Sequence, residues 1–376
     1  MGSAFSTSYY LIPISFMQIG IDASRAQKAE KTGTEWYSFR LIEELKKMPS
    51  DNRIILYSKD PLDGDLAKLP ANFESKILHW PPKYLWTQVR LMWEMLINPP
   101  DVLFTPAHSA PFLSRAKIVI TIHDVGFKVL PHLYSWRDKL YHRFSTWWNC
   151  KFAWRIIVPS EFTKGELIKY YKVDPTKIQV IYHGTPDPVL KSFPPKGEHF
   201  LLFVGRLEKK KNILNIIKAF ELVKKTYSDL KLILAGRPGY GFDEVQNYIN
   251  SSERKNSIET KGYISEEEKW QLYQNAQALV FPTLYEGFGI PITEAQAAGC
   301  PVITSSAGAN KEIAGDGAIL VNPYDAFDIA EAVTKVLGNK GLRGTLIQKG
   351  KEYIRRFSWE KTAQQTFEVL VGTGAR

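Results

Sequence analysis

The sequence predicts an α/β protein built from two doubly wound parallel sheets. Short apolar segments alternate with helical segments almost throughout the chain, which is typical of strand–helix–strand units. At 376 residues the chain is too long for one typical hydrophobic core. A Pro-, Lys- and Gly-rich stretch at residues 193–197 interrupts the alternation, as a linker does. We therefore expect two domains that face each other across a cleft.

The first domain is expected to span residues 17–190. Its predicted strands are residues 18–22, 53–57, 76–79, 101–104, 118–123, 155–158 and 178–182. Its predicted helices are residues 34–47, 85–97, 136–153, and a last one that runs from a Ser160 cap to about residue 171. Residues 1–16 contain no Lys or Arg and make a poor signal peptide, so we interpret them as a leader or extension before Met17.

The second domain is expected to span residues 191–355. Its predicted strands are residues 200–204, 231–235, 258–261, 278–281, 302–304 and 318–321. Ser265 and Glu268 form the pattern of a capping box for the helix after Tyr263. Residues 356–376 are predicted to hold a final helix, beginning after Ser358, that can cross back to the first domain.

Charge and cysteine content narrow the partners. The net charge of +10 favours an anionic partner, such as nucleic acid, an anionic membrane face or a phosphorylated substrate. Nucleic acid is the weakest of these because no zinc-finger or RNP-like motif is present. No segment approaches the roughly 20 apolar residues of a membrane span. Cys150 and Cys300 suggest no disulfide framework, so we expect a cytoplasmic protein, and no His/Cys cluster has metal-ligand spacing.

Two glutamates bracket a glycine-rich turn in residues 286–294. Gly287 and Gly289 allow a ligand to approach the backbone closely, and Pro291 is expected at the first position of a helix. The amides at such a helix N-terminus form an anion site. Glu294, about one turn into the helix, is placed to bind a diol, so phosphate and hydroxyls together indicate a nucleotide-sugar. Taken alone, either glutamate is more commonly an ordinary loop or helix-dipole carboxylate.

A basic loop follows the first strand of the second domain. Gly205 ends the strand, Arg206 follows at once, and Lys211 comes five residues later. Two cations at the end of a parallel strand would stabilise the negative charge that develops on a departing diphosphate. Lys209 and Lys210 are expected to be solvated instead.

The first domain offers weaker candidates. His123 follows an apolar strand and could accept or orient a sugar hydroxyl, or could simply be a hydrogen-bonded core histidine. Gly33 precedes a helix and could admit a phosphate or an acceptor, although a simple turn explains it equally well. His108 and His183 are second-rank candidates.

The segment 134–155 mixes aromatic and basic residues. Such a helix can lie on a membrane surface or shape an acceptor groove. More commonly its aromatic stripe is the side that packs on the core.

Together these residues resemble the retaining glycosyltransferases of family 4, which have the GT-B fold of two facing Rossmann-like domains. The resemblance covers the chain after Met17. Residues 281–295 are similar to the family's E-x7-E motif, preceded as in the family by Gly205-Arg206 and Lys211, and residues 314–325 resemble the segment that follows the motif in bacterial mannosyl- and rhamnosyltransferase-like members. The first loop departs from the family, because it carries only Gly33 instead of paired glycines.

The resemblance implies sugar transfer from a nucleoside-diphosphate donor, with retention and without a metal ion. Arg206 and Lys211 would hold the diphosphate, and Glu286 and His123 would lie at the transferred sugar. Glu294 would bind the ribose.

The base would lie beside Tyr263 and Ile264, and backbone amides would hold hydroxyls and phosphates. These amides belong to Gly287, Phe288, Gly289 and Ile290. Similarity to the mannosyltransferase-like members of the family favours GDP-mannose as the donor. The acceptor would be a glycan or lipid-linked hydroxyl, with possible peripheral contact at the inner face of an anionic membrane.

Three other functions fit parts of the pattern. A glycoside hydrolase could use Glu286 and Glu294 as acid and nucleophile, but Arg206 and Lys211 argue against it. A nicotinamide-dependent oxidoreductase is disfavoured because no strand leads into a Gly-x-Gly-x-x-Gly turn. A non-catalytic binding protein on the same fold remains an alternative.

Overall fold

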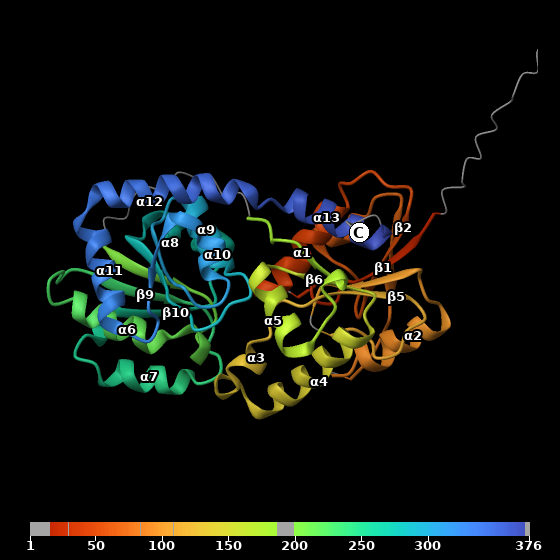
Figure 1. The fold of residues 1–376 in the computed structure, drawn as a ribbon, viewed down its shortest axis with the longest axis horizontal. Coiled ribbons are helices and arrows are strands. Elements are labelled where there is room, and N and C mark those ends of the chain that lie inside the picture. Colours follow the sequence, from red (N-terminus) through yellow and green to blue (C-terminus); the bar gives the residue numbers. More distant parts are fainter. Residues whose placement is uncertain (1–15, 29, 83, 108, 186–198, 373–376) are drawn as a thin grey trace, which may run out of the picture.

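The structure is a computed structural model that describes residues 16–28, 30–82, 84–107, 109–185 and 199–372. Within these residues it contains two parallel sheets with helices packed around them (Figure 1). The strand orders are β3-β2-β1-β4-β5-β6-β7 and β10-β9-β8-β11-β12-β13. In each sheet the chain winds from its first strand toward one edge and then returns toward the other, which defines a doubly wound sheet. The predicted fold class is confirmed.

The first sheet and its helices lie between residues 18 and 180. The strands are β1 Gln18–Asp22, β2 Arg53–Ser58, β3 Phe73–Ile77, β4 Val102–Thr105, β5 Lys117–Thr121, β6 Arg155–Val158 and β7 Ile178–Val180. The longer helical elements are α1 Gly33–Leu45, η2 Thr87–Leu91 running into α2 Met92–Ile97, α3 Gly126–Val129, α4 Trp136–Phe152 and α5 Glu161–Tyr171.

The second sheet begins at residue 200. Its strands are β8 Phe200–Val204, β9 Lys231–Ala235, β10 Ile258–Gly262, β11 Ala278–Phe281, β12 Val302–Ser305 and β13 Ala318–Val321. The helical elements from here to the end of the described chain are η5 Lys209–Lys211, α6 Ile213–Val223, α7 Phe242–Ser251, η6 Lys255–Ser257, α8 Glu266–Asn275, α9 Ile290–Ala298, α10 Asn310–Ala314, η7 Gly315–Gly317, α11 Ala326–Gly338, α12 Lys340–Tyr353, η8 Ile354–Arg356 and α13 Trp359–Val371.

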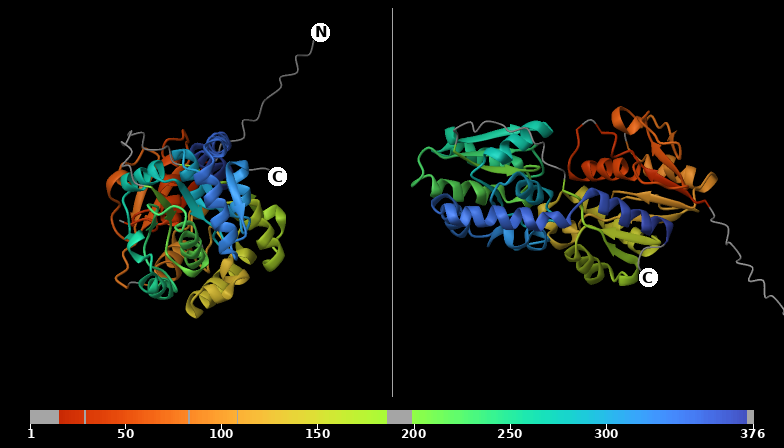
Figure 2. Two further views of the ribbon diagram at one scale, coloured as in Figure 1. Left: turned by 90° about the vertical axis from the view of Figure 1, so that its left-hand side faces the viewer. Right: turned by 90° about the horizontal axis from the view of Figure 1, so that it is seen from above.

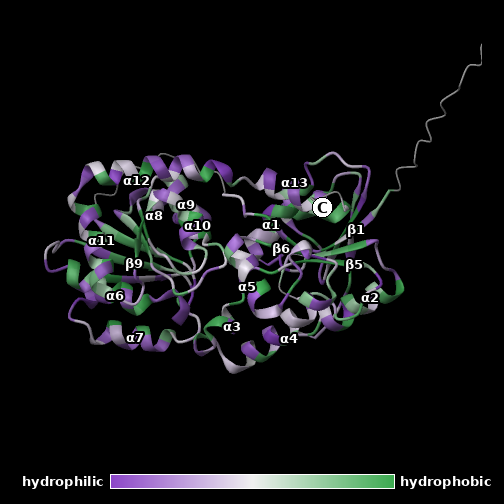
Figure 3. Ribbon diagram, in the orientation of Figure 1, coloured by the Kyte–Doolittle hydropathy of each residue, from purple (hydrophilic) through white to green (hydrophobic). Residues whose placement is uncertain are grey.

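Each sheet supplies a hydrophobic core. Strand β8 is buried at all five positions, because helices cover both of its faces. Helix α6 packs on it through Ile213, Ile216, Ile217 and Phe220, which recur at helical spacing on one face. Figure 3 shows hydrophobic residues gathered along the strands of both sheets, with hydrophilic residues on the outer helices.

Two local predictions are corrected by the structure. The strand predicted at residues 76–79 is β3, Phe73–Ile77, an edge strand whose buried and exposed residues partly alternate. The apolar pair Ile77-Leu78 marks its end rather than its centre. The Ser265 hydroxyl accepts a hydrogen bond from the Glu268 amide at 3.1 Å, which is one half of the predicted capping box. The other half is missing, because the Glu268 carboxylate lies 3.2 Å from Lys261 instead of accepting from the Ser265 amide.

The chain returns to the first domain at its C-terminal end. Helix α12 runs along the second domain and α13 lies on the first, beside α1 (Figure 1 and Figure 2). Trp359, Ala363 and Leu370 of α13 enter the core of the first domain. A Cβ at Gly184 would lie 2.3 Å from the Trp359 backbone nitrogen, so only glycine permits this close crossing.

Some predictions concern residues that the structure does not describe. The interpretation of residues 1–16 as a leader falls almost wholly outside the described residues, as do the linker at 193–197 and His108.

The prediction that the aromatic stripe of helix α4 packs on the core is wrong. Trp136, Phe144 and Trp147 are exposed, whereas Ser145 and Asn149 are buried. The helix therefore turns its polar residues inward.

Candidate active site at the domain junction

The glycine-rich turn after β11 touches the first domain directly. A Cβ at Gly287 would lie 1.8 Å from the carbonyl oxygen of His123, which follows β5. The hydroxyl of Ser160, the residue before α5, donates to the Gly287 carbonyl at 2.6 Å. The carboxyl ends of strands from both sheets therefore meet at this turn, the edge at which doubly wound folds bind ligands.

Lys211 and Glu286 form a close ion pair at this junction. Their Nζ and Oε1 atoms are 2.5 Å apart, and both side chains are nearly buried. The Lys211 ammonium also lies 5.4 Å from the centre of the Phe281 ring. The structure thus brings together two of the residues that were predicted separately from the basic loop and the E-x7-E motif.

Helix α9 points its N-terminus at the same place. Gly289 is the N-cap with a φ of 95°, a conformation that favours glycine, and Pro291 is the second helical residue instead of the predicted first. In the described part of the chain, the amides of Phe288, Gly289 and Ile290 have no hydrogen-bond acceptor in the protein. Such amides at a positive dipole end can bind an anion.

Glu294 is held separately inside the second domain. Its carboxylate is 4% exposed and accepts bonds from Lys269 at 2.6 Å and from Tyr273 at 3.0 Å. Burial raises the pKa of the Tyr273 hydroxyl well above its usual range, and the neighbouring Glu294 charge adds to this. Burial alone would lower the pKa of Lys269, but the Glu294 and Glu266 carboxylates raise it. Because Glu286 and Glu294 have different lysine partners, they do not form a symmetric acid–base dyad.

His123 and His183 of the first domain lie side by side near this turn, with their ring centres 5.4 Å apart. His123 Nε2 is 3.0 Å from the Pro106 carbonyl oxygen, and burial lowers the pKa of the ring. Among the described residues, neither ring nitrogen of buried His183 has a hydrogen-bond partner, and the ring packs 4.7 Å from that of Phe288. Burial, followed by the neighbouring His123, lowers the pKa of His183 well below 6.5. Both imidazoles are therefore neutral at neutral pH.

Phe288 and Gly33 make contacts between the domains. The Phe288 ring is buried against His183 and Phe357, so its backbone amide, and not its side chain, is available to a ligand. Gly33 begins α1, and a Cβ there would lie 3.7 Å from the Ile290 side chain. The first βα loop therefore faces the N-terminus of α9.

The loops expected to surround the base lie further along the junction. The Tyr263 ring is half-exposed, with the Arg237 guanidinium 5.2 Å from its centre. Arg237 also forms an ion pair with Glu30 of the first domain. Ile264 packs partly into the core of the second domain.

Arg206 is not joined to the Lys211–Glu286 pair. Its side chain is 61% exposed, and its Nε lies 4.0 Å from Glu208. The preceding Gly205 has a φ of 144°, which turns the chain sharply at the end of β8.

The prediction that Lys210 is solvated was wrong. Its side chain is mostly buried, 3.6 Å from Asp124 of the first domain, whereas Lys209 lies 3.0 Å from Glu244 on the outer side. Burial alone would lower the pKa of Lys210, but Asp124 is the first of several anionic neighbours that raise it well above its usual range. Residues 209–211 form a 3₁₀ turn, in which successive side chains point about 120° apart. This turn is why three adjacent lysines have three different partners.

Sequence reasoning also missed Glu312 of α10. Its carboxylate accepts the amides of Glu161 and Phe162, at 2.8 and 3.0 Å, and the Tyr182 hydroxyl at 2.9 Å. A carboxylate of the second domain thereby caps helix α5 of the first. No local sequence motif indicates this cap, because the amides that Glu312 accepts from lie about 150 residues away from it in the chain.

Two doubly wound domains meet here at the ends of their strands, and a lysine–glutamate pair and an open helix N-terminus lie at the junction. This arrangement is typical of enzymes that act on nucleotide-linked groups. Residues 31–187 match the family described as Glycosyltransferase Family 4, and residues 190–353 match Glycosyl transferases group 1. The chain belongs to the group 1 glycosyltransferases of family 4 and has the GT-B fold.

Named relatives agree with this assignment. The chain is 30% identical over 360 residues to the O-antigen chain mannosyltransferase RfbU of Salmonella typhimurium, covering 92% of this chain and 97% of the relative. It is 29% identical over 267 residues to the O-antigen chain mannosyltransferase B of Escherichia coli, covering 68% and 69%. Among solved structures, Anabaena HepE in complex with UDP-glucose has a TM-score of 0.75 at 18% identity, covering 95% of this chain and all of that one.

Proposed function

We propose that this glycosyltransferase transfers a hexose, with mannose favoured, from a nucleoside-diphosphate sugar to a hydroxyl of a glycan or lipid-linked acceptor, with retention of configuration. The 2.5 Å contact between Lys211 and Glu286, beside the open amides of α9, carries the proposal. This contact puts a cation and a carboxylate next to the N-terminal amides of α9, which supports roles for them at the diphosphate and at the transferred sugar.

Different residues of the site would contact different parts of the donor. Lys211 and the α9 amides would hold the diphosphate and stabilise the negative charge that develops as its bond to the sugar breaks. Exposed Arg206 would move onto the diphosphate when the donor binds. Glu286 would accept hydrogen bonds from sugar hydroxyls, and His123 would line the sugar from the first domain.

The nucleoside would lie further into the second domain. Glu294, already preorganised by Lys269 and Tyr273, retains lone pairs for the ribose diol. Tyr263 offers a half-exposed ring beside the base. The two O-antigen chain mannosyltransferases among the relatives support mannose as the sugar, and we propose GDP-mannose as its donor.

The proposal includes metal-independent transfer in the cytoplasm, at the inner face of a membrane. Protein cations would replace a metal ion at the diphosphate. Among the described helices, none is long and apolar enough to cross a bilayer. Turnover that survives dialysis against EDTA is expected, whereas loss of turnover restored by Mg²⁺ would contradict metal independence.

Thermal shift against GDP, UDP, ADP and dTDP is the first test, and GDP should raise the melting temperature most. Turnover of GDP-mannose, with the product anomer assigned by NMR, then tests retention. Failure of all four nucleotides to stabilise the protein would overturn donor binding. Hydrolysis of aryl glycosides without a nucleotide would instead favour the glycoside hydrolase, and binding without turnover the non-catalytic alternative.

A further inference from the structure

Lys210 lies between carboxylates of both domains. Its Nζ is 3.6 Å from Oδ2 of Asp124 in the first domain and 3.7 Å from Oε1 of Glu208 in the second. All three side chains are mostly buried, with exposed fractions of 15, 22 and 17%. The other ion pair that joins the domains within the described residues, Arg237–Glu30, is about half-exposed on both sides. Solvent and salt screen an exposed pair far more than a buried one, so Lys210 is the stronger electrostatic link.

The first domain also encloses the Lys210 ammonium with an aromatic ring. The Nζ atom lies 5.4 Å from the centre of the Tyr134 ring. Burial raises the pKa of the Tyr134 hydroxyl above its usual range, and the negative charge of Asp124 adds to this effect. A Cβ at Gly126 would lie 2.2 Å from the Tyr134 hydroxyl, so glycine at this position leaves room for the ring. The Lys210 side chain therefore packs into the first domain, although the residue belongs to the second.

The second-domain end of this link is continuous with the donor-side residues. Lys210 precedes Lys211, whose ammonium pairs with Glu286 at 2.5 Å. The Lys210 carbonyl accepts the Leu284 amide at 2.9 Å, two residues before that glutamate. A displacement of Lys210 would therefore move the basic loop and the start of the glycine-rich turn together.

The first-domain end of the link is continuous with His123. Asp124 follows this histidine directly, and its Oδ1 accepts the Gly126 amide at 3.0 Å, which holds the carboxylate in the loop after β5. The His123 carbonyl oxygen is so close to Gly287 that a Cβ there would lie 1.8 Å away. The ion pair between Lys210 and Asp124 therefore fixes this loop where it meets the glycine-rich turn.

We propose that Lys210 is a positioning residue for sugar transfer. Through its ion pair with Asp124 it holds the loop of His123 against the donor-side residues, and it contacts no atom of the donor in this role. Placement matters because a shift of about 1 Å from the productive geometry can cost about 10²-fold in rate. The inference rests on the proposed function for its effect on transfer, whereas the link between the domains is measurable without a substrate.

Hydrogen exchange of the full chain, followed by mass spectrometry, tests the link directly. Lys210→Met keeps most of the apolar stem and removes the charge, and Asp124→Asn removes the charge of its partner. Lys210→Met should speed exchange of the first-domain amides at residues 123–130 several-fold, although the substitution lies in the second domain. Asp124→Asn should do the same at residues 205–212. Lys210→Arg, which keeps the charge, should restore slow exchange.

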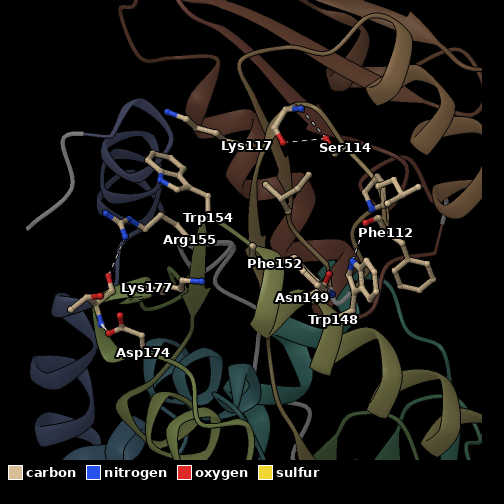
Figure 4. A pocket seen from close by; sticks show the side chains of 16 residues that line it. Phe112, Ser114, Lys117, Trp148, Asn149, Phe152, Trp154, Arg155, Asp174 and Lys177 are labelled. Atoms are coloured by element: carbon tan, nitrogen blue, oxygen red, sulfur yellow. Dashed lines mark hydrogen bonds between the residues drawn. The ribbon is translucent and has the colours of Figure 1, made fainter.

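Two other lysines provide matched controls. Lys209 pairs with Glu244 at 3.0 Å within the second domain, so Lys209→Met removes an ion pair that does not cross the junction. Lys117, the first residue of β5, lies 4.9 Å from the Trp154 ring centre in a groove at the opposite end of that strand, and Figure 4 shows both side chains. Lys117→Met removes a lysine beside a ring far from the junction. Both control variants should keep wild-type exchange at residues 123–130.

Steady-state kinetics measure the effect on transfer. Lys210→Met and Asp124→Asn should each lower kcat by about tenfold to a hundredfold, with the KM for GDP-mannose changed less than about threefold. Because the two residues act through one contact, the double variant should be no slower than the slower single variant. All three should keep the wild-type thermal shift with GDP, since the donor-side residues are unchanged.

Three results would overturn the positioning role or separate it from the proposed function. Wild-type exchange at residues 123–130 in Lys210→Met would overturn it, whatever the kinetics. A lost thermal shift with GDP and a raised KM in Lys210→Met alone would overturn it in favour of direct donor binding by Lys210. Failure of the wild-type enzyme to transfer mannose would overturn the proposed donor, and the exchange comparison would still decide on the link. Asp124→Asn, which barely changes the side-chain volume, decides if Lys210→Met does not fold.

Discussion

The hydroxyl of Ser160 donates a hydrogen bond to the carbonyl of Gly287 at 2.6 Å, across the boundary between the two domains. The Thr163 hydroxyl donates to the same oxygen at 3.3 Å. In the opposite direction, Glu312 of the second domain caps helix α5 of the first. The glycine-rich turn at residues 286–289 is therefore positioned by the first domain as well as by the second. The relative placement of the two domains and the conformation of this turn depend on the same few bonds.

Ser160→Ala should weaken donor binding as well as stability. It leaves the Gly287 carbonyl with only the longer Thr163 contact and removes the N-cap of α5, which together cost about 1–3 kcal/mol. We expect a raised KM for the donor and a larger radius of gyration by small-angle scattering. Ser305→Ala is the matched control, because Ser305 is also buried and donates to Thr283 at 2.6 Å within one domain. An unchanged radius and KM in Ser160→Ala would refute a positioning role.

Gly287→Ala should force the domains apart. Its Cβ would meet the His123 carbonyl oxygen at 1.8 Å, and backbone atoms cannot move aside as a flexible side chain would. We predict loss of turnover with retained far-UV circular dichroism. Gly344→Ala in α12 has open space around its Cβ and should be neutral or slightly stabilising, by up to about 1 kcal/mol. Wild-type turnover in Gly287→Ala would show that the junction is more adaptable than its geometry indicates.

Lys211→Ala should lower kcat by about 10²–10³, the usual effect of removing one group that stabilises developing negative charge. Lys209→Ala, two residues away, removes only an outer contact with Glu244 and should leave kcat unchanged. Steady-state kinetics with the identified donor, together with melting temperatures, distinguish catalysis from stability. Similar kinetic losses in both variants would point to general electrostatics of the basic loop instead of a specific role.

Acid should destabilise the protein partly through His183. Burial lowers its pKa below 6.5 in the folded state, so the unfolded chain binds the proton more readily. The stabilising contribution is complete above about pH 6.5 and is lost as the pH falls below that value, by at most about 1.4 kcal/mol per pH unit for one group. His183→Phe should flatten this slope in denaturant unfolding between about pH 6.5 and 5. His132→Phe, on an exposed histidine, should not, and parallel slopes in all three proteins would exclude His183.

Local sequence was sufficient to predict the strands and helices of the fold and several residues of the candidate site. Apolar runs that alternate with helical segments predict two doubly wound sheets, because strand and helix periodicity are properties of neighbouring residues. The same local reasoning found the glycine turn, Pro291, Lys211 and Glu286. Their pairing was foreseeable only in outline, from the rule that parallel strands end at one edge.

Tertiary structure decided which side chain faces which. Lys210 and Lys211 are adjacent, yet one pairs with Asp124 of the first domain and the other with Glu286 of the second. Helix α4 carries an aromatic stripe for which sequence alone favours a place in the core, and the packed domain exposes Trp136, Phe144 and Trp147 of that stripe. Periodicity fixes the angle between side chains on one element, but not what lies opposite them. That depends on contacts between residues far apart in the chain, which only the assembled domains define.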